Sequence, residues 1–141
     1  MRYLGLDLGT KTLGLALTDK TNTISSPYKT IRFHDYEELV EEIKKIVEEK
    51  EVGKFILGYP KNMNNSLGFA VERTNNFKAI LEQNFDLPII LIDERLSTTE
   101  AENILIETDT KRMKRKEVID AYAAAIILDT YLKESRDNSG Y

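Results

Sequence analysis

The chain of 141 residues contains no cysteine, which excludes a disulfide framework, a zinc–thiolate site and a cysteine nucleophile. Its single histidine, His34, lies in a predicted strand-to-helix connection, where a surface position is expected rather than a general base. Apolar runs stay far below the roughly 18 residues of a membrane span. Asp7 interrupts the N-terminal apolar segment, which is not typical of a signal peptide. We therefore expect a cytoplasmic protein with no membrane association.

Neither acidic nor basic residues are in large excess, but both kinds are unevenly distributed along the chain. The net charge of −4 differs from that of a strongly basic nucleic-acid binder. Residues 111–116 nevertheless hold five basic residues, and acid is concentrated over 37–51. A basic loop at 111–116 would favour a phosphate backbone without sequence preference, or would simply be a solvated loop.

Composition and hydrophobic periodicity predict one α/β domain over 1–141, with a flexible tail over about 134–141. Two strands should form a hairpin, and a third antiparallel strand should follow, with Pro27 marking a bulge or an edge. Asp35 is the expected N-cap of the first helix, and Ser97 or Thr98 that of the third. The predicted class is a mixed five-stranded sheet flanked by helices. The predicted strands are 2–8, 12–19, 23–33, 55–58 and 88–92, and the predicted helices are 36–50, 69–84, 97–107 and 117–133.

Three acids stand out by their placement. Asp7 interrupts an apolar strand, Glu94 follows a buried strand, and Asp120 begins an Ala-rich helix. Buried carboxylates must be paired, protonated or bound to metal, and carboxylate oxygens suit Mg²⁺ or Mn²⁺. Two such ions about 3.5–4 Å apart can activate water and stabilise the leaving oxygen in phosphodiester cleavage. No spacing rule joins these acids, so each also has an ordinary structural explanation. Asp7 could close a turn, Glu94 could end a strand at the surface, and Asp120 could be a first-turn acid favoured by the helix dipole.

Two further segments could contact phosphate. In Asp7–Thr12, Gly9 permits close backbone approach, although the segment matches neither the P-loop nor the dinucleotide fingerprint. Arg95 could contact a phosphate or pair with Asp93. The polar loop 60–68 could line a substrate cleft or could be a hydrogen-bonded turn, with Lys61, Asn62, Asn64, Asn65 and Ser66 as its polar side chains.

Four ordered segments together resemble the YqgF-type family of Holliday junction resolvase-like proteins, also described as pre-16S ribosomal RNA nucleases. The resemblance spans about residues 1–133 and is carried by GLDLGTKTLGLA from Gly5, GYPKNMNNSLG from Gly58, DERLSTTEA from Asp93 and DAYAAAIIL from Asp120. It implies an RNase H-like fold in which Asp7, Glu94 and Asp120 are metal-binding catalytic acids, with Asp7 bridging two ions.

One departure from the family pattern lies in the second segment. Where the family reads Asn-Met-Asp-Gly-Ser, this chain reads Asn-Met-Asn-Asn-Ser over 62–66. Asn tolerates positive φ, so Asn65 could still occupy a glycine-type turn position. The departure concerns substrate contacts rather than the metal site.

The resemblance implies a metal-dependent endonuclease that processes the 5′ end of pre-16S rRNA with two Mg²⁺ or Mn²⁺ ions. Its partners would be nucleic acid and the ribosome or assembly factors, and it would be a monomer or a homodimer. One alternative is a resolvase of branched DNA, which would be expected to dimerise. Another is a non-catalytic nucleic-acid-binding factor. A third is an actin-like nucleotide-binding protein, but the chain lacks the length and the second phosphate loop that such proteins need. The expected substrate-binding residues are Thr10, Lys11, Asn62, Asn64, Ser66, Arg95, Lys111, Arg112, Lys114, Arg115 and Lys116.

Overall fold

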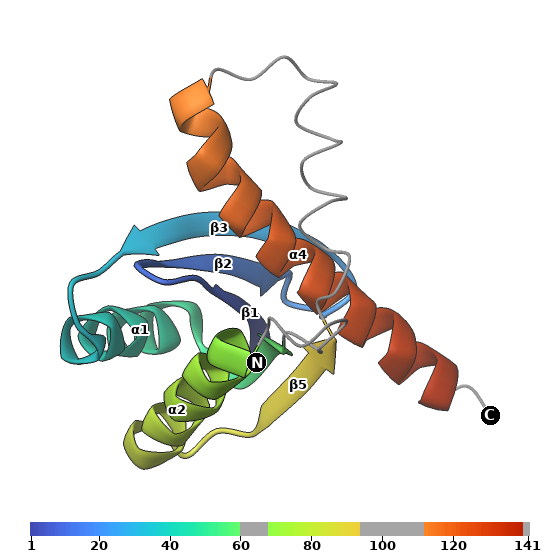
Figure 1. Cartoon of the computed structure of the whole chain (residues 1–141). Helices are drawn as coiled ribbons and strands as arrows, with labels where there is room; N and C mark the ends of the chain where they lie inside the picture. Colours follow the sequence, from blue (N-terminus) through green and yellow to red (C-terminus); the bar gives the residue numbers. More distant parts are fainter. Residues whose placement is uncertain (60–67, 94–111, 140–141) are drawn as a thin grey trace.

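The computed structural model describes residues 1–59, 68–93 and 112–139 (Figure 1). Five strands form one sheet in the order β3-β2-β1-β4-β5. The β1–β2 and β2–β3 pairs are antiparallel, whereas β1–β4 and β4–β5 are parallel. The predicted mixed five-stranded sheet is therefore confirmed. The elements are β1 (Arg2–Leu8), β2 (Thr12–Thr18), β3 (Ser25–Arg32), α1 (Tyr36–Lys50), β4 (Val52–Tyr59), α2 (Gly68–Asn84), β5 (Ile89–Asp93) and α4 (Arg112–Ser139).

The predicted hairpin joins β1 to β2 through a two-residue loop. The Gly9 N–H donates to the Thr12 carbonyl over 2.8 Å, so that Thr10 and Lys11 form the loop. This loop fixes the register, which places Asp7 directly opposite Gly14.

The third predicted strand is β3, an edge strand among those described. Its register against β2 shifts where Lys29 pairs with Leu15 and Pro27 pairs with Ala16. Proline cannot donate a ladder hydrogen bond and is tolerated at such bulges and edges. Both parts of the expectation for Pro27 are confirmed.

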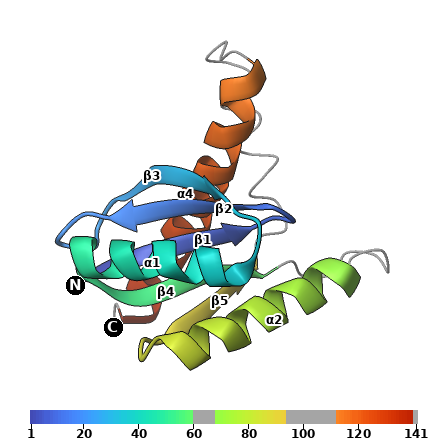
Figure 2. The ribbon, with the colours of Figure 1, turned by 90° about the vertical axis from the view of Figure 1, so that its left-hand side faces the viewer.

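Helices α1 and α2 lie on one face of the sheet and α4 lies on the other (Figure 2). Successive strand residues point to opposite faces, and β1 follows this rule. Leu4 and Leu6 are buried among the residues that pack against α1 and α2, whereas the Gly5 backbone meets α4. Asp7 therefore lies on the α4 face of the sheet.

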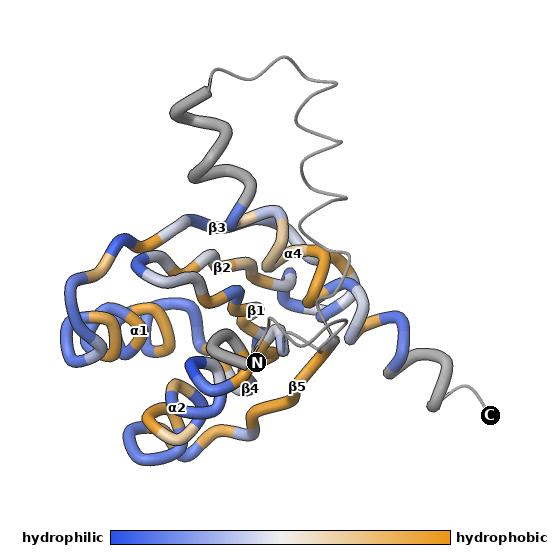
Figure 3. The backbone as a smooth tube through the Cα atoms, in the orientation of Figure 1, coloured by the Kyte–Doolittle hydropathy of each residue, from blue (hydrophilic) through white to orange (hydrophobic). Residues whose placement is uncertain are grey.

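The helices on the first face match their predicted positions. Helix α1 spans Tyr36–Lys50, and the Asp35 carboxylate accepts from the Glu38 N–H over 2.8 Å, which confirms the N-cap. Phe77 and Leu81 of α2 are fully buried. Strand β5 is hydrophobic from Ile89 to Ile92 (Figure 3), as expected for a strand with residues in contact with both cores.

Helix α4 is longer than predicted. It begins at Arg112 and ends at Ser139, so the expected basic loop is mostly helical and the expected tail is helical as far as Ser139. The reason is that Lys, Arg, Met and Glu have good helix propensity, and neither Gly nor Pro occurs between 111 and 139. The helix predicted over 97–107 lies outside the described residues.

The C-terminal half of α4 is anchored to the sheet by Tyr131. The Lys54 ammonium of β4 donates to the Tyr131 hydroxyl over 2.8 Å, and its nitrogen lies 4.9 Å from the Tyr3 ring centre. The two tyrosine rings meet edge to face at 5.7 Å. These contacts hold α4 against β1 and β4.

Candidate active site

Two of the predicted acids approach each other where α4 crosses β1 and β2. Asp7 pairs with Gly14, and a Cβ on Gly14 would lie 2.0 Å from the Asp120 main-chain oxygen. Directly opposed residues of an antiparallel pair project from the same face. The Asp120 backbone therefore lies over the immediate neighbour of Asp7, and both carboxylate residues are half-buried.

The same close approach continues along the helix. A Cβ on Gly5 would lie 2.8 Å from the Ala124 main-chain oxygen. Ala123 and Ala124 are fully buried on the facing side of α4. Small residues on both surfaces thus let the helix backbone reach the sheet, which sets the depth at which Asp120 sits.

Thr12 holds the Asp120 carboxylate, a role that sequence reasoning missed. Its hydroxyl donates to Asp120 Oδ2 over 3.1 Å. Hydrogen bonds of this kind orient carboxylates that serve as ligands or as catalytic groups. The strand predicted over 12–19 places Thr12 on the same face as Gly14, but local sequence does not indicate that Asp120 lies over that face.

We expect Thr12→Val to lower the cleavage rate about 10- to 100-fold while leaving most of the stability intact, because it removes one carboxylate-orienting hydrogen bond. Rate and thermal melting should be measured on the same preparation. Thr12→Ser, which keeps the hydroxyl, is the matched control and should retain most of the activity. Equal rates for the Val and Ser variants would contradict the role of this hydrogen bond.

The remaining predicted site residues divide into three groups. Thr10 and Lys11 are exposed in the β1–β2 loop, beside the two acids. Arg112, Lys114, Arg115 and Lys116 lie in the first turns of α4. The others lie outside the described residues, namely Asn62, Asn64, Ser66, Glu94, Arg95 and Lys111.

The carboxyl ends of three strands meet at one edge of the sheet. Strands β1, β4 and β5 are parallel, so their carboxyl ends share one edge of the sheet. Tyr59 and Asp93 end β4 and β5 and are register partners. Glu94 follows Asp93 directly in the chain. Within the described ranges, however, three or more potential metal ligands are not found together.

Asp19, the acid that follows β2, has a structural role in a turn. It lies at the opposite end of β2 from Asp7. The Thr21 hydroxyl donates to its carboxylate, as do the Ile24 and Thr23 backbone N–H groups. These hydrogen bonds favour the ionised form and hold the Asp19 pKa well below its usual range. Asp19 therefore closes the turn after β2.

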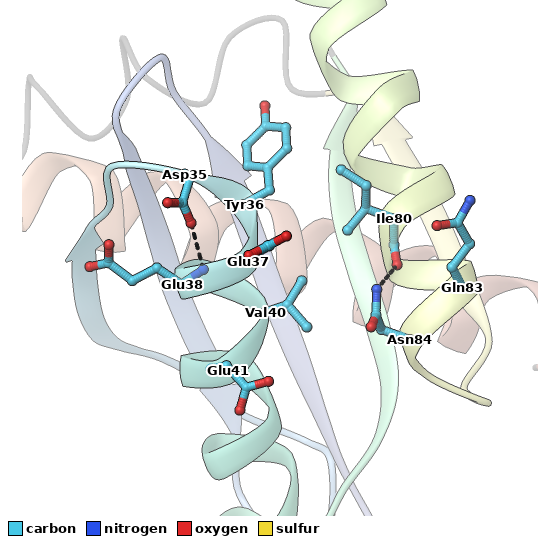
Figure 4. Close-up of a pocket in the computed structure, with 9 residues that line it drawn as sticks. All are labelled: Asp35, Tyr36, Glu37, Glu38, Val40, Glu41, Ile80, Gln83 and Asn84. Carbon is cyan, nitrogen blue, oxygen red and sulfur yellow. Dashed lines mark hydrogen bonds between the residues drawn. The ribbon is translucent and has the colours of Figure 1, made fainter.

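A groove of about 590 Å³ lies between α1 and α2, on the sheet face that α4 does not cover (Figure 4). Val40 and Ile80 face each other across the groove. Tyr36 also lines the groove, and burial raises the pKa of its hydroxyl, an effect partly opposed by the Arg73 charge. Its acidic lining disfavours phosphate, so the groove does not fit a nucleic-acid interface. The acidic lining residues are Asp35, Glu37, Glu38 and Glu41.

Solved structures share this architecture. The chain matches the Thermus thermophilus RuvC in complex with a Holliday junction substrate with a TM-score of 0.61 and 11% identity, covering 99% of this chain and 97% of that one. It matches the fowlpox virus Holliday junction resolvase with a TM-score of 0.54 and 13% identity, over 95% and 99% of the two chains. The fold is thus the RNase H-like fold of RuvC-type resolvases, and identities this low concern the fold alone.

Sequence relatives are much closer. A protein of Thermoanaerobacter pseudethanolicus is 46% identical over 138 residues, 97% of this chain and 99% of its own length. A Geobacillus protein is 46% identical over 134 residues, 94% and 97% of the two chains. Both carry the name "Putative pre-16S rRNA nuclease". The family model described as "RuvX: Holliday junction resolvase" matches residues 1–134, and the chain belongs to this family. None of the described helices has the length and hydrophobicity needed to cross a bilayer.

Proposed function

We propose that the protein is an endonuclease that hydrolyses phosphodiester bonds in structured RNA, with the 5′ end of pre-16S rRNA as its substrate. The names of relatives that match nearly the whole chain support this substrate. One structural observation carries the proposal. Asp7 of β1 is the register partner of Gly14, and the Asp120 backbone of α4 lies directly over Gly14, so both acids are neighbours of one glycine. A cytoplasmic location and contact with the ribosome or its assembly factors follow from that substrate.

The described acids fit a divalent metal ion of the Mg²⁺ or Mn²⁺ type. Carboxylate oxygens are hard ligands, and the Thr12 hydroxyl orients one of the two carboxylates. Asp7, Glu94 and Asp120 would be the residues that hold the metal. When bound, the ions would supply the Lewis acid that lowers the pKa of water and neutralises charge on the phosphate.

The chain's own groups position the substrate and the carboxylates. Asp7 lies on β1, the central strand of the sheet, where neighbouring strands restrict its backbone. Thr12 donates to Asp120 Oδ2, which fixes the orientation of this carboxylate. The loop residues Thr10 and Lys11 would hold phosphate oxygens next to these acids. The basic turn of α4, 112–116, would hold phosphates further along the strand.

Branched DNA is the second candidate substrate, because the matching family model carries the description of a Holliday junction resolvase. A junction presents two symmetric strands, so a protein that resolves it is expected to place two sites symmetrically in a dimer. An enzyme that trims an RNA end can act as a monomer. Oligomeric state in solution therefore discriminates between the two substrates.

The proposal predicts metal-dependent cleavage of a defined substrate. An end-labelled 16S precursor fragment and a synthetic four-way DNA junction should each be incubated with the protein in Mg²⁺, in Mn²⁺ and in EDTA. We expect cleavage of the RNA at discrete positions with metal, and its loss in EDTA. Junction cutting without RNA cutting would replace the proposed substrate by branched DNA. Binding of both substrates without cutting of either would contradict the nuclease assignment and favour a non-catalytic factor.

A further inference from the structure

Arg32, the last residue of β3, lies beside Thr12 and on the same face of the sheet as the candidate active site. It is the register partner of Thr12 in the antiparallel β2–β3 pair. Side chains at directly opposed positions leave the sheet on the same face. Because the Thr12 hydroxyl reaches Asp120 on the α4 face, the Arg32 side chain leaves the sheet on that face too.

The described surroundings of Arg32 leave its guanidinium accessible to a ligand. The residue is exposed, and among the described carboxylates none lies within ion-pair distance of its guanidinium. The Phe33 N–H donates to the Lys11 carbonyl over 3.0 Å, so the loop that carries Lys11 is joined to this end of β3. Two exposed cationic residues thus lie at one end of the β2–β3 pair, next to Thr12.

Helix α4 adds basic positions on the same side. Its first turns extend beyond the sheet past β3 in both views (Figures 1 and 2). Those turns carry the basic sequence 112–116. The opposite face of the sheet is covered in part by α1, where Glu residues outnumber Lys residues. A polyanion that crosses the candidate site toward β3 would therefore meet cations, whereas the α1 side would repel it.

We propose that Arg32 binds a backbone phosphate of the nucleic acid, so that the substrate runs from the Asp7–Asp120 site over the end of β2 and β3. A guanidinium suits this role because its planar donors can hold two phosphate oxygens at once. Phosphate contacts fix position and register, and they carry no sequence information. The inference rests on the proposed nuclease function and adds the direction in which the substrate lies.

The chain offers a matched control on the same strand. Lys29 is exposed like Arg32, but its register partner is Leu15, whose side chain is buried with the α1 and α2 face. Lys29 therefore leaves the sheet on the opposite face, with its nitrogen 5.5 Å from the Tyr28 ring centre. Lys29→Ala removes the same charge as Arg32→Ala without touching the proposed path.

The test is equilibrium binding of the labelled 16S precursor fragment and of the four-way junction, in EDTA and over a series of salt concentrations. Arg32→Ala should weaken binding about 3- to 10-fold at moderate salt and reduce the slope of log K against log salt by about 0.7–0.9. Arg32→Lys should restore the slope but not all of the affinity, because lysine keeps the charge but lacks the planar pair of donors that can hold two phosphate oxygens. Lys29→Ala should match the wild type.

The outcomes separate the inference from the function on which it rests. Wild-type affinity and slope for Arg32→Ala, or an equal loss for Lys29→Ala, would overturn the phosphate contact even if the enzyme cuts RNA. A wild-type protein that binds without cutting, with binding weakened only by Arg32→Ala, would support the contact and overturn the nuclease assignment. Absence of any binding by the wild type would overturn both.

Discussion

Asp7→Asn should reduce metal-dependent cleavage at least about a hundredfold, which corresponds to about 2.7 kcal/mol of activation free energy. The substitution keeps the shape of the side chain and removes its charge. A neutral amide binds a hard divalent cation more weakly than a carboxylate does, and Asp7 is one of the acids proposed to hold the metal. Single-turnover cleavage of the labelled precursor fragment measures the effect.

The control for this variant is Asp86→Asn, which removes an exposed carboxylate between α2 and β5. It should cleave like the wild type. Both variants should melt at nearly the wild-type temperature, since Asp7 is only half-buried. Wild-type cleavage by Asp7→Asn, in Mg²⁺ or in Mn²⁺, would remove Asp7 from the proposed site.

Gly14→Ala should lower the free energy of unfolding by about 3 kcal/mol and the melting temperature by on the order of 10 °C. The added Cβ would lie 2.0 Å from the Asp120 main-chain oxygen, so α4 must move away from the sheet. Replacing a strand glycine reduces the entropy of the unfolded chain and stabilises by only about 0.4–1 kcal/mol. The steric cost therefore dominates, and cleavage should fall as well because Asp120 moves away from Asp7.

Gly53→Ala is the matched control in β4. Its Cβ would lie 2.7 Å from Met1 Cβ, but Met1 is 76% exposed, so a shift of this one residue relieves the contact without moving a packed helix. Chemical denaturation of both variants should therefore show a much smaller change for Gly53→Ala. A Gly14→Ala protein as stable as Gly53→Ala would contradict the tight helix–sheet contact in the structure.

The sheet was largely predictable because local patterns determine its parts. Alternating leucines in 12–19 and the short loop after Gly9 identified the hairpin, and three-and-four spacing identified α1. Pro27 was correctly expected at a bulge and an edge. The start of α4 was predicted wrongly, because the run of charge at 111–116 was interpreted as a loop although its residues favour helix.

The contacts within the candidate site could not be read from local sequence. Thr12 and Asp120 are 108 positions apart, so their hydrogen bond depends on how α4 docks on the sheet. Arg32 was not singled out because its face depends on the register of β3, which shifts at the bulge near Pro27. Gly14 was seen only as part of an apolar strand, whereas its missing side chain is what admits α4.

The distance along the chain between the two halves of the site has a consequence for the timing of activity. The part that carries Asp120 leaves the ribosome long after the part that carries Thr12. At about 5–20 residues per second, the 108 positions between them take roughly 5–20 seconds to synthesise. A nascent chain therefore carries Asp7 and its hairpin long before it carries Asp120. Under the proposed function, the chain could cleave nucleic acid only after the segment that carries Asp120 has been made.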